Sequence, residues 1–76
     1  MTIPAHIRTI AEEVLTEKQF EAFELECAGW GLLRIGRYLH IRKQSVAGRL
    51  EGAHVRLMDA GVRQDVNGDW YVDEAA

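Results

Sequence analysis

The sequence has one cysteine, one proline and no long apolar run among its 76 residues. Because Cys27 is the only cysteine, no internal disulfide can form. No stretch approaches the ~18 consecutive apolar residues of a transmembrane helix, so no membrane-spanning segment is expected. The N-terminus also lacks a basic segment followed by an apolar one, which predicts a chain without a secretory signal that stays in a reducing cytoplasm.

Residue combinations that carry catalysis or bind metal ions are missing as well. His6, His40 and His54 have no acidic residue at a recognisable catalytic or metal-binding spacing, and there is no glycine-rich phosphate loop. Cys27 has no histidine or second cysteine at ligand spacing, so we expect it in the core. The sequence therefore predicts a protein that is not an enzyme, with no metal, no cofactor and no small-molecule ligand.

Basic residues are a minority, nine against twelve acidic residues for a net charge of −3, but they are concentrated in the middle of the chain. Residues 1–30 carry a net charge of −4, residues 31–56 carry +5 and residues 57–76 carry −4. The central block contains one acid, Glu51, and these bases: Arg34, Arg37, Arg42, Lys43, Arg49 and Arg56. Phosphate binding depends on local potential, so this block favours contact with a polyanion. The alternative is that these side chains only form a solvated surface of the protein.

Two helices in the same block are predicted by apolar residues at helical spacing. The first helix, over 32–39, has as its inner face Leu32, Ile35, Gly36 and Leu39. The second, over about 43–60, has as its inner face Val46, Leu50, Ala53 and Leu57. The three residues between the helices, 40–42, leave room only for a sharp corner. Ile41 can fill the space between the two helices there, and Gly36, which has no side chain, allows them to cross closely. This is the helix-turn-helix pattern, whose second helix can enter a DNA major groove.

Two earlier helices complete a single small domain over residues 1–76. We expect a helix over about 4–13, with a partly frayed arm as the alternative. A further helix over 17–28 begins with a capping box formed by Thr16 and Gln19. A domain of this size buries only about 60% of its unfolded surface, so its stability should be small.

A β-hairpin is predicted at the C-terminus, because Asn67 and Gly68 between two β-prone runs favour a type I′ turn. The hairpin spans 62–72 and is followed by a loose tail over 73–76. The register set by this turn has two pairs: Val66 with Asp69, and Gln64 with Tyr71. One face of the hairpin then carries Val62, Val66 and Tyr71. We favour a packing or dimerisation role for the hairpin over a DNA-contacting wing, because its acidic residues oppose phosphate contact.

Candidate contact residues lie on the outward side of the second helix and around the corner. The residues placed for base edges are Lys43, Gln44, Ala47 and Gly48. The residues better placed for phosphates are Arg34, Arg37, Arg42, Ser45 and Arg49. Gly48 and Gly52 form a Gly-x-x-x-Gly motif, which indicates close approach of DNA or of a second copy, or else a tolerated weakness. A homodimer through this face or through the hairpin is therefore expected as one arrangement.

The pattern over about residues 15–58 resembles the LuxR-type and sigma-factor region-four helix-turn-helix family. The residues that carry the resemblance are Leu15, Thr16, Gln19, Phe23, Leu25, Gly29, Ile35, Gly36, Leu39, Ile41, Ser45, Val46, Leu50 and Leu57. His40 stands where the family usually has glycine, and Arg42 where it has serine. The resemblance implies a DNA-binding module with the helix from Lys43 in the major groove. Since no receiver domain or polymerase-binding region accompanies it, we expect a small stand-alone regulator of a phage or bacterial type.

These patterns together predict a mainly α fold, a three- to four-helix helix-turn-helix bundle with a C-terminal β-hairpin. The first functional hypothesis is sequence-selective binding of double-stranded DNA, with regulation of transcription as its purpose. The alternative is a protein-interaction module on the same scaffold that binds RNA polymerase or another regulator. The acidic ends, the two glycines of the helix and Trp70, which we expect to be exposed, favour the alternative.

Overall fold

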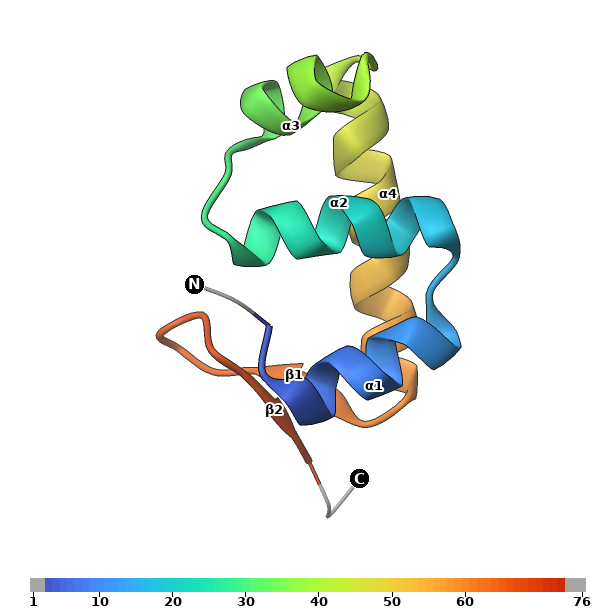
Figure 1. Cartoon of the computed structure of the whole chain (residues 1–76). Helices are drawn as coiled ribbons and strands as arrows, with labels where there is room; N and C mark the ends of the chain where they lie inside the picture. Colours follow the sequence, from blue (N-terminus) through green and yellow to red (C-terminus); the bar gives the residue numbers. More distant parts are fainter. Residues whose placement is uncertain (1–2, 74–76) are drawn as a thin grey trace.

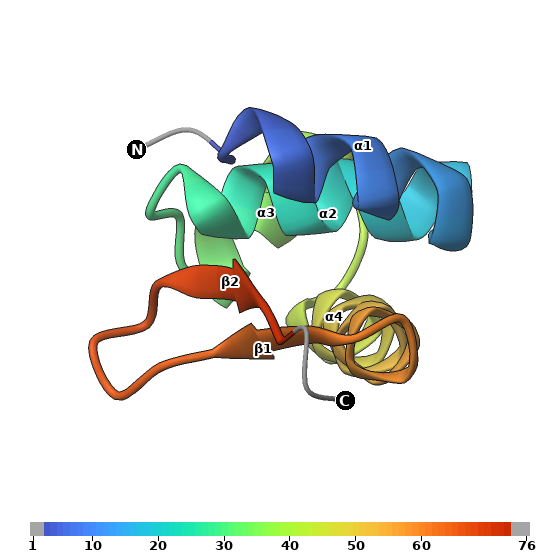
Figure 2. The same cartoon turned by 90° about the horizontal axis from the view of Figure 1, so that it is seen from below.

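The computed structural model describes residues 3–73, and its elements follow the predicted order. The elements are α1 (Ala5–Val14), α2 (Glu17–Cys27), α3 (Leu32–Leu39), α4 (Lys43–Asp59), β1 (Val62–Gln64) and β2 (Trp70–Val72). The long α4 runs along the molecule, α2 crosses it near its middle, and α3 packs at its start (Figure 1). At the other end, α1 contacts α2, α4 and β2, and the hairpin flanks the end of α4 (Figure 2). The mainly α architecture with a C-terminal hairpin is therefore confirmed.

Local signals explain where the first two helices begin. Pro4 precedes α1, and its φ of −55° suits a helix start. The Thr16 hydroxyl accepts a hydrogen bond from the Gln19 N–H, and Gln19 Oε1 accepts one from the Thr16 N–H, both at 3.1 Å. This is the predicted capping box, which satisfies two amides that a helix start leaves free. The helical interpretation of the N-terminal segment is confirmed, since Ile7 and Ala11 of α1 are buried.

The centre of the core is the inner face of α4. All four residues predicted for that face are buried, namely Val46, Leu50, Ala53 and Leu57. Each of the other elements except β2 contributes at least one fully buried side chain to the same cluster, including Ile7, Phe23, Ile35 and Val62. Burial of one such side chain stabilises the fold by about 1.5–3 kcal/mol. The elements are therefore held together mainly through α4.

The corner between α3 and α4 depends on two backbone features. A Cβ on Gly36 would lie 2.8 Å from the Ile41 carbonyl oxygen, so the close crossing needs glycine there. His40 ends α3 in the left-handed conformation, with φ +59° and ψ +41°, which glycine adopts more readily. The prediction that Leu32 faces the core is wrong, because the first turn of α3 lies away from α4 and Leu32 is 41% exposed (Figure 1).

The hairpin forms, but its turn and register differ from the prediction. The observed cross-strand pairs are Val62 with Val72, Arg63 with Tyr71, and Gln64 with Trp70. Gly68 has φ +87° and donates its N–H to the Asp65 carbonyl at 3.0 Å, whereas Asn67 does not have positive φ. This is a three-residue loop with a glycine bulge rather than a type I′ turn. The Asp65 carboxylate favours it by accepting the N–H groups of Asn67 and Asp69, at 2.9 and 3.0 Å.

The shift of one residue decides which side chains face the core. Val62, Trp70 and Val72 lie on the inner side and pack against the helices, while Tyr71 points outward and is 45% exposed. Val66 lies at the loop tip and is fully exposed. The predicted face made of Val62, Val66 and Tyr71 is therefore wrong.

Two further expectations about the C-terminal region need correction. Trp70 is half-buried rather than exposed, since its ring centroid lies 5.3 Å from that of Phe23 and 5.3 Å from that of His54. It therefore gives no support to the protein-interaction hypothesis. The Asp73 N–H donates to the Gly61 carbonyl at 2.7 Å, so residue 73 continues the hairpin instead of starting a loose tail. The rest of the predicted tail, 74–76, lies outside the described residues.

Candidate nucleic-acid interface

The first half of α4 is open to solvent, at the end of the molecule away from α1 and the hairpin (Figure 1). All four residues predicted to contact bases are exposed, namely Lys43, Gln44, Ala47 and Gly48. Val46 and Leu50 on the opposite side of the helix are buried. The helix therefore presents a polar outer face on an apolar base, which is the arrangement that a groove-binding helix needs.

A shallow hollow of about 450 Å³ lies beside the corner. Leu33 and Arg37 of α3, His40 of the turn, and Arg42 and Lys43 at the start of α4 line it. Arg42 caps α4 without a side-chain hydrogen bond, so the first amides of the helix keep their partial positive charge. Three cationic side chains and a helix start thus meet at one place, which favours binding of an anion.

These cations differ from Arg8 and Arg63 in having no carboxylate partner among residues 3–73. Arg8 binds Glu24 at 2.5 Å, and Arg63 lies 4.0 Å from Asp73. Across residues 3–73, no ion pair involves Lys43 or any of the arginines predicted to contact phosphates. The positive charge of this end is therefore available to an external anion.

Arg34 is set apart from the hollow by an aromatic stack. Its guanidinium lies 3.9 Å from the centre of the Trp30 ring, and Trp30 meets Tyr38 edge-on with centroids 5.3 Å apart. This contact was not predicted from the sequence. Part of the signal was present, because Arg34 and Tyr38 lie four residues apart on one side of α3. Trp30 precedes the helix, so helical spacing does not place its ring.

The other predicted phosphate contacts lie on a different side of α4. Ser45 is exposed and Arg49 is half-buried. At 100° per residue, both occupy the flank of α4 turned away from Lys43. The structure therefore brings together Arg37, Arg42 and Lys43 but not the whole predicted set.

The two glycines of α4 do not share an open surface. Among the described residues, no neighbouring atom would lie within 4 Å of a Cβ on Gly48. A Cβ on Gly52 would lie 2.8 Å from Nε2 of Gln19. Gly52 therefore belongs to the crossing of α2 over α4, and a second copy could use Gly48 but not Gly52 without displacing Gln19.

No family model, curated protein or solved structure was found to match this chain. Its function is therefore inferred from the exposed surface of α4, the hollow at the corner and the unpaired cations around them.

Over residues 3–73, no group of three or more His, Cys, Asp or Glu side chains is arranged to hold a metal ion. The same part of the chain contains no helix with the length and apolarity to cross a membrane.

Burial, together with the Glu26 and Glu24 carboxylates, raises the pKa of the Cys27 thiol to about 12. The thiol therefore stays protonated at neutral pH and is a poor nucleophile.

Proposed function

We propose that the protein binds double-stranded DNA with the first half of α4 in the major groove and thereby regulates transcription. The observation that carries this proposal is the gathering of Arg37, Arg42 and Lys43, all exposed and unpaired, at the start of an exposed helix. The major groove is about 12 Å wide and admits one helix, while the phosphates at its edges attract flanking cations.

The roles of the individual residues follow from their positions on α4. Gln44 and Gly48 point most directly outward and Ala47 is exposed beside them. These three are therefore assigned to base edges, where glutamine pairs with adenine and alanine can contact a thymine methyl group. Lys43 lines the hollow and can reach a guanine or a phosphate. Glu51 is exposed one turn further along, and its carboxylate limits how far along α4 the phosphates can approach.

The proposal includes a cytoplasmic location and one of two binding modes. A single copy would occupy one half-site, whereas a symmetric pair would occupy a palindromic site with half-sites about 34 Å apart. The outward side of the hairpin is where a second copy could pack and leave the DNA-facing side of α4 free. Analytical ultracentrifugation with and without a palindromic duplex separates these modes.

The experiment that tests DNA binding compares two double variants with the same loss of charge. Fluorescence anisotropy with a labelled duplex at low salt should show that Arg42→Ala with Lys43→Ala weakens binding by about thirtyfold. The control is Arg56→Ala with Arg63→Ala, because Arg56 donates to the Val14 carbonyl at 3.2 Å and Arg63 to the Met58 carbonyl at 2.6 Å. The control should bind within about twofold of the unmodified protein. Circular dichroism establishes that both variants are folded.

The salt dependence provides a second readout. Three phosphate contacts, from Arg37, Arg42 and Lys43, predict a slope of about −3 for log K against log salt, and the corner variant should reduce its size by about two. Equal weakening by both double variants would mean that only net charge matters. That result, or binding that does not respond to salt, would overturn the proposal.

A second candidate function is supported by the exposed apolar side chains of α3. Leu33 and Tyr38 are 57% and 61% exposed, beside the arginine stacked on Trp30. Aromatic residues and arginine are enriched where proteins bind one another. On this reading, the chain binds RNA polymerase or another regulator through α3. Loss of polymerase binding in Leu33→Ala with Tyr38→Ala, together with unchanged DNA affinity in the corner variant, would favour it.

A further inference from the structure

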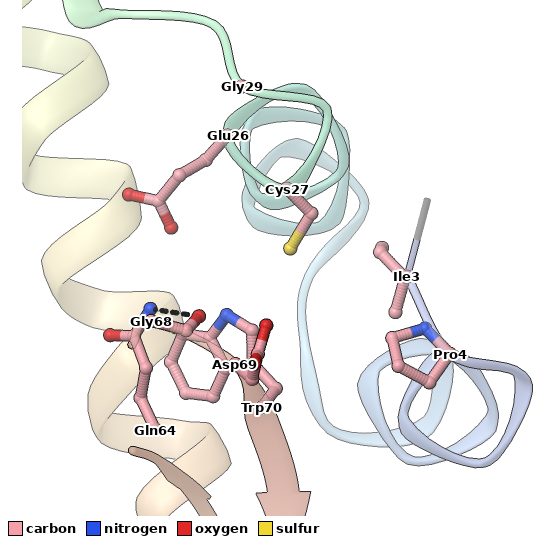
Figure 3. Close-up of a pocket in the computed structure, with 9 residues that line it drawn as sticks. All are labelled: Ile3, Pro4, Glu26, Cys27, Gly29, Gln64, Gly68, Asp69 and Trp70. Atoms are coloured by element: carbon pink, nitrogen blue, oxygen red, sulfur yellow. Dashed lines mark hydrogen bonds between the residues drawn. The ribbon is translucent and has the colours of Figure 1, made fainter. Parts of the chain in front are cut away.

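A second cavity, of about 390 Å³, lies between the end of α2 and the hairpin (Figure 3). Its walls come from three distant parts of the chain, the segment before α1, the end of α2 and the hairpin. The wall residues that matter here are Ile3, Pro4, Glu26, Cys27, Asp69 and Trp70. This volume is within the range of pockets that hold small molecules.

The body of this cavity is apolar and pre-formed. The Cys27 side chain points from α2 toward the hairpin, and Ile3 and Pro4 lie across from it (Figure 3). Trp70 forms part of the wall, and its ring is fixed by an edge-on contact with Phe23 at 5.3 Å. Because these walls are held by the core, an apolar ligand would not have to order them first.

The described side chains that line this cavity carry charge of one sign. Among the described residues that line it, Glu26 and Asp69 are acidic and none is basic. Glu26 is already engaged, since its Oε1 lies 2.7 Å from Nε2 of His54. The Asp69 carboxylate forms no hydrogen bond or ion pair with any residue between Ile3 and Asp73, although its backbone is held by two bonds to Asp65. An exposed carboxylate, carried on a hydrogen-bonded backbone, thus stands at the edge of an apolar cavity.

We propose that this cavity binds a small organic cation. The apolar body of the ligand would pack against Cys27, Ile3 and Trp70, and its ammonium group would donate to the Asp69 carboxylate. An anion of the same shape would be repelled by Asp69 and Glu26, and a neutral molecule would forgo the charge-assisted hydrogen bond. The proposal does not depend on DNA binding, because the cavity is separate from the hollow at the corner and can be tested on the free protein.

The test uses three probes that share a phenyl group and differ in charge: 2-phenylethylammonium, 2-phenylethanol and 3-phenylpropionate. Two-dimensional NMR of the full chain at neutral pH and low salt follows the backbone amides and the Trp70 indole N–H. The ammonium probe should bind saturably at about millimolar concentration, as expected for a ligand of this size. The largest shifts should fall on Cys27, Gly29, Gly68 and Trp70.

Two variants and a matched control make the test decisive. Asp69→Asn should weaken binding of the ammonium probe about fivefold, whereas Asp59→Asn on the exposed end of α4 should leave it unchanged. Cys27→Leu should block all three probes by filling the cavity, and its retained amide spectrum would show that the fold is intact. Equal affinity for all three probes, shifts centred elsewhere, or no saturable shift would overturn the proposal.

Discussion

The two ends of α4 use the same kinds of side chain in opposite ways. At the hairpin end, Arg63 is near Asp73, Arg56 donates to a carbonyl, and Trp70 is packed against Phe23. At the corner end, the cations have no carboxylate partner within residues 3–73, and apolar side chains of α3 face solvent. The hairpin end thus engages its arginines within the fold, whereas the corner end leaves its cations without carboxylate partners among residues 3–73. Large apolar side chains are exposed at both ends, for example Leu33 and Val66.

The comparison also extends to the backbone. The corner holds His40 in a left-handed conformation that is unfavourable for a residue with a side chain. The hairpin end meets the same need for positive φ with glycine, at Gly61 and Gly68. Substitutions at the hairpin end should therefore change stability without changing affinity for DNA. At the corner, measuring both quantities for each substitution should separate residues that only hold the turn from residues that contact DNA.

The largest effect is expected for Trp70→Ala. Loss of a half-buried indole and its contacts with Phe23 and His54 should lower the free energy of unfolding by about 3 kcal/mol, or Tm by ~15 °C. DNA affinity, measured at a temperature where circular dichroism shows the variant folded, should stay within about twofold. Tyr71→Ala on the outward side of the same strand is the control and should cost less than about 0.5 kcal/mol. A large loss of DNA affinity in folded Trp70→Ala would mean that the two ends are not independent.

Much of the fold could be predicted because its signals are local or periodic. The capping box at Thr16 and the buried stripe of α4 depend only on residues a few positions apart. The hairpin register could not be predicted from Asn67 and Gly68 alone. The Asp65 side chain competes for the backbone amides of the loop and selects a longer turn, which moves Trp70 to the inner side.

The candidate site could be predicted as a charged region but not resolved into individual contacts. Arg42 and Arg56 belong to the same basic block of the sequence. Only the three-dimensional arrangement shows that Arg56 reaches the Val14 carbonyl, 42 positions away, while Arg42 opens onto the hollow. In the same way, Gly48 and Gly52 look equivalent until Gln19 is seen to cover Gly52. Contacts between distant parts of the chain carry this information, and a single sequence does not display them.

The next largest effect is expected for Gly36→Ala at the corner. The added Cβ would meet the Ile41 carbonyl oxygen at 2.8 Å, so α3 and α4 must separate. We expect a loss of about 2 kcal/mol in unfolding free energy, even after the gain in helix propensity, together with weaker DNA binding. Urea denaturation measures the first quantity and anisotropy the second.

Gly48→Ala is the matched control for this substitution, since both glycines lie inside helices. With open space around Gly48, alanine there should raise the unfolding free energy by up to about 1 kcal/mol. If Gly36→Ala proved as stable as Gly48→Ala, the corner would not depend on the close crossing. A stable Gly48→Ala variant that binds DNA less tightly would support close approach of the α4 backbone to the bases.

The smallest effect is expected for His40→Gly, and its sign is opposite to that of Trp70→Ala and Gly36→Ala. Glycine relieves the left-handed conformation but gains freedom in the unfolded chain, so the net stabilisation should be about 0.5–1 kcal/mol, or ~3–6 °C in Tm. His40→Ala removes the imidazole without relieving the backbone, so its stability should match that of the unmodified protein. His40 also lines the hollow, so its imidazole could contact DNA as well as belong to the turn. Equal loss of DNA affinity in His40→Gly and His40→Ala would assign the imidazole to a phosphate contact. Unchanged affinity in both, with stabilisation in the glycine variant alone, would leave His40 as a residue of the turn.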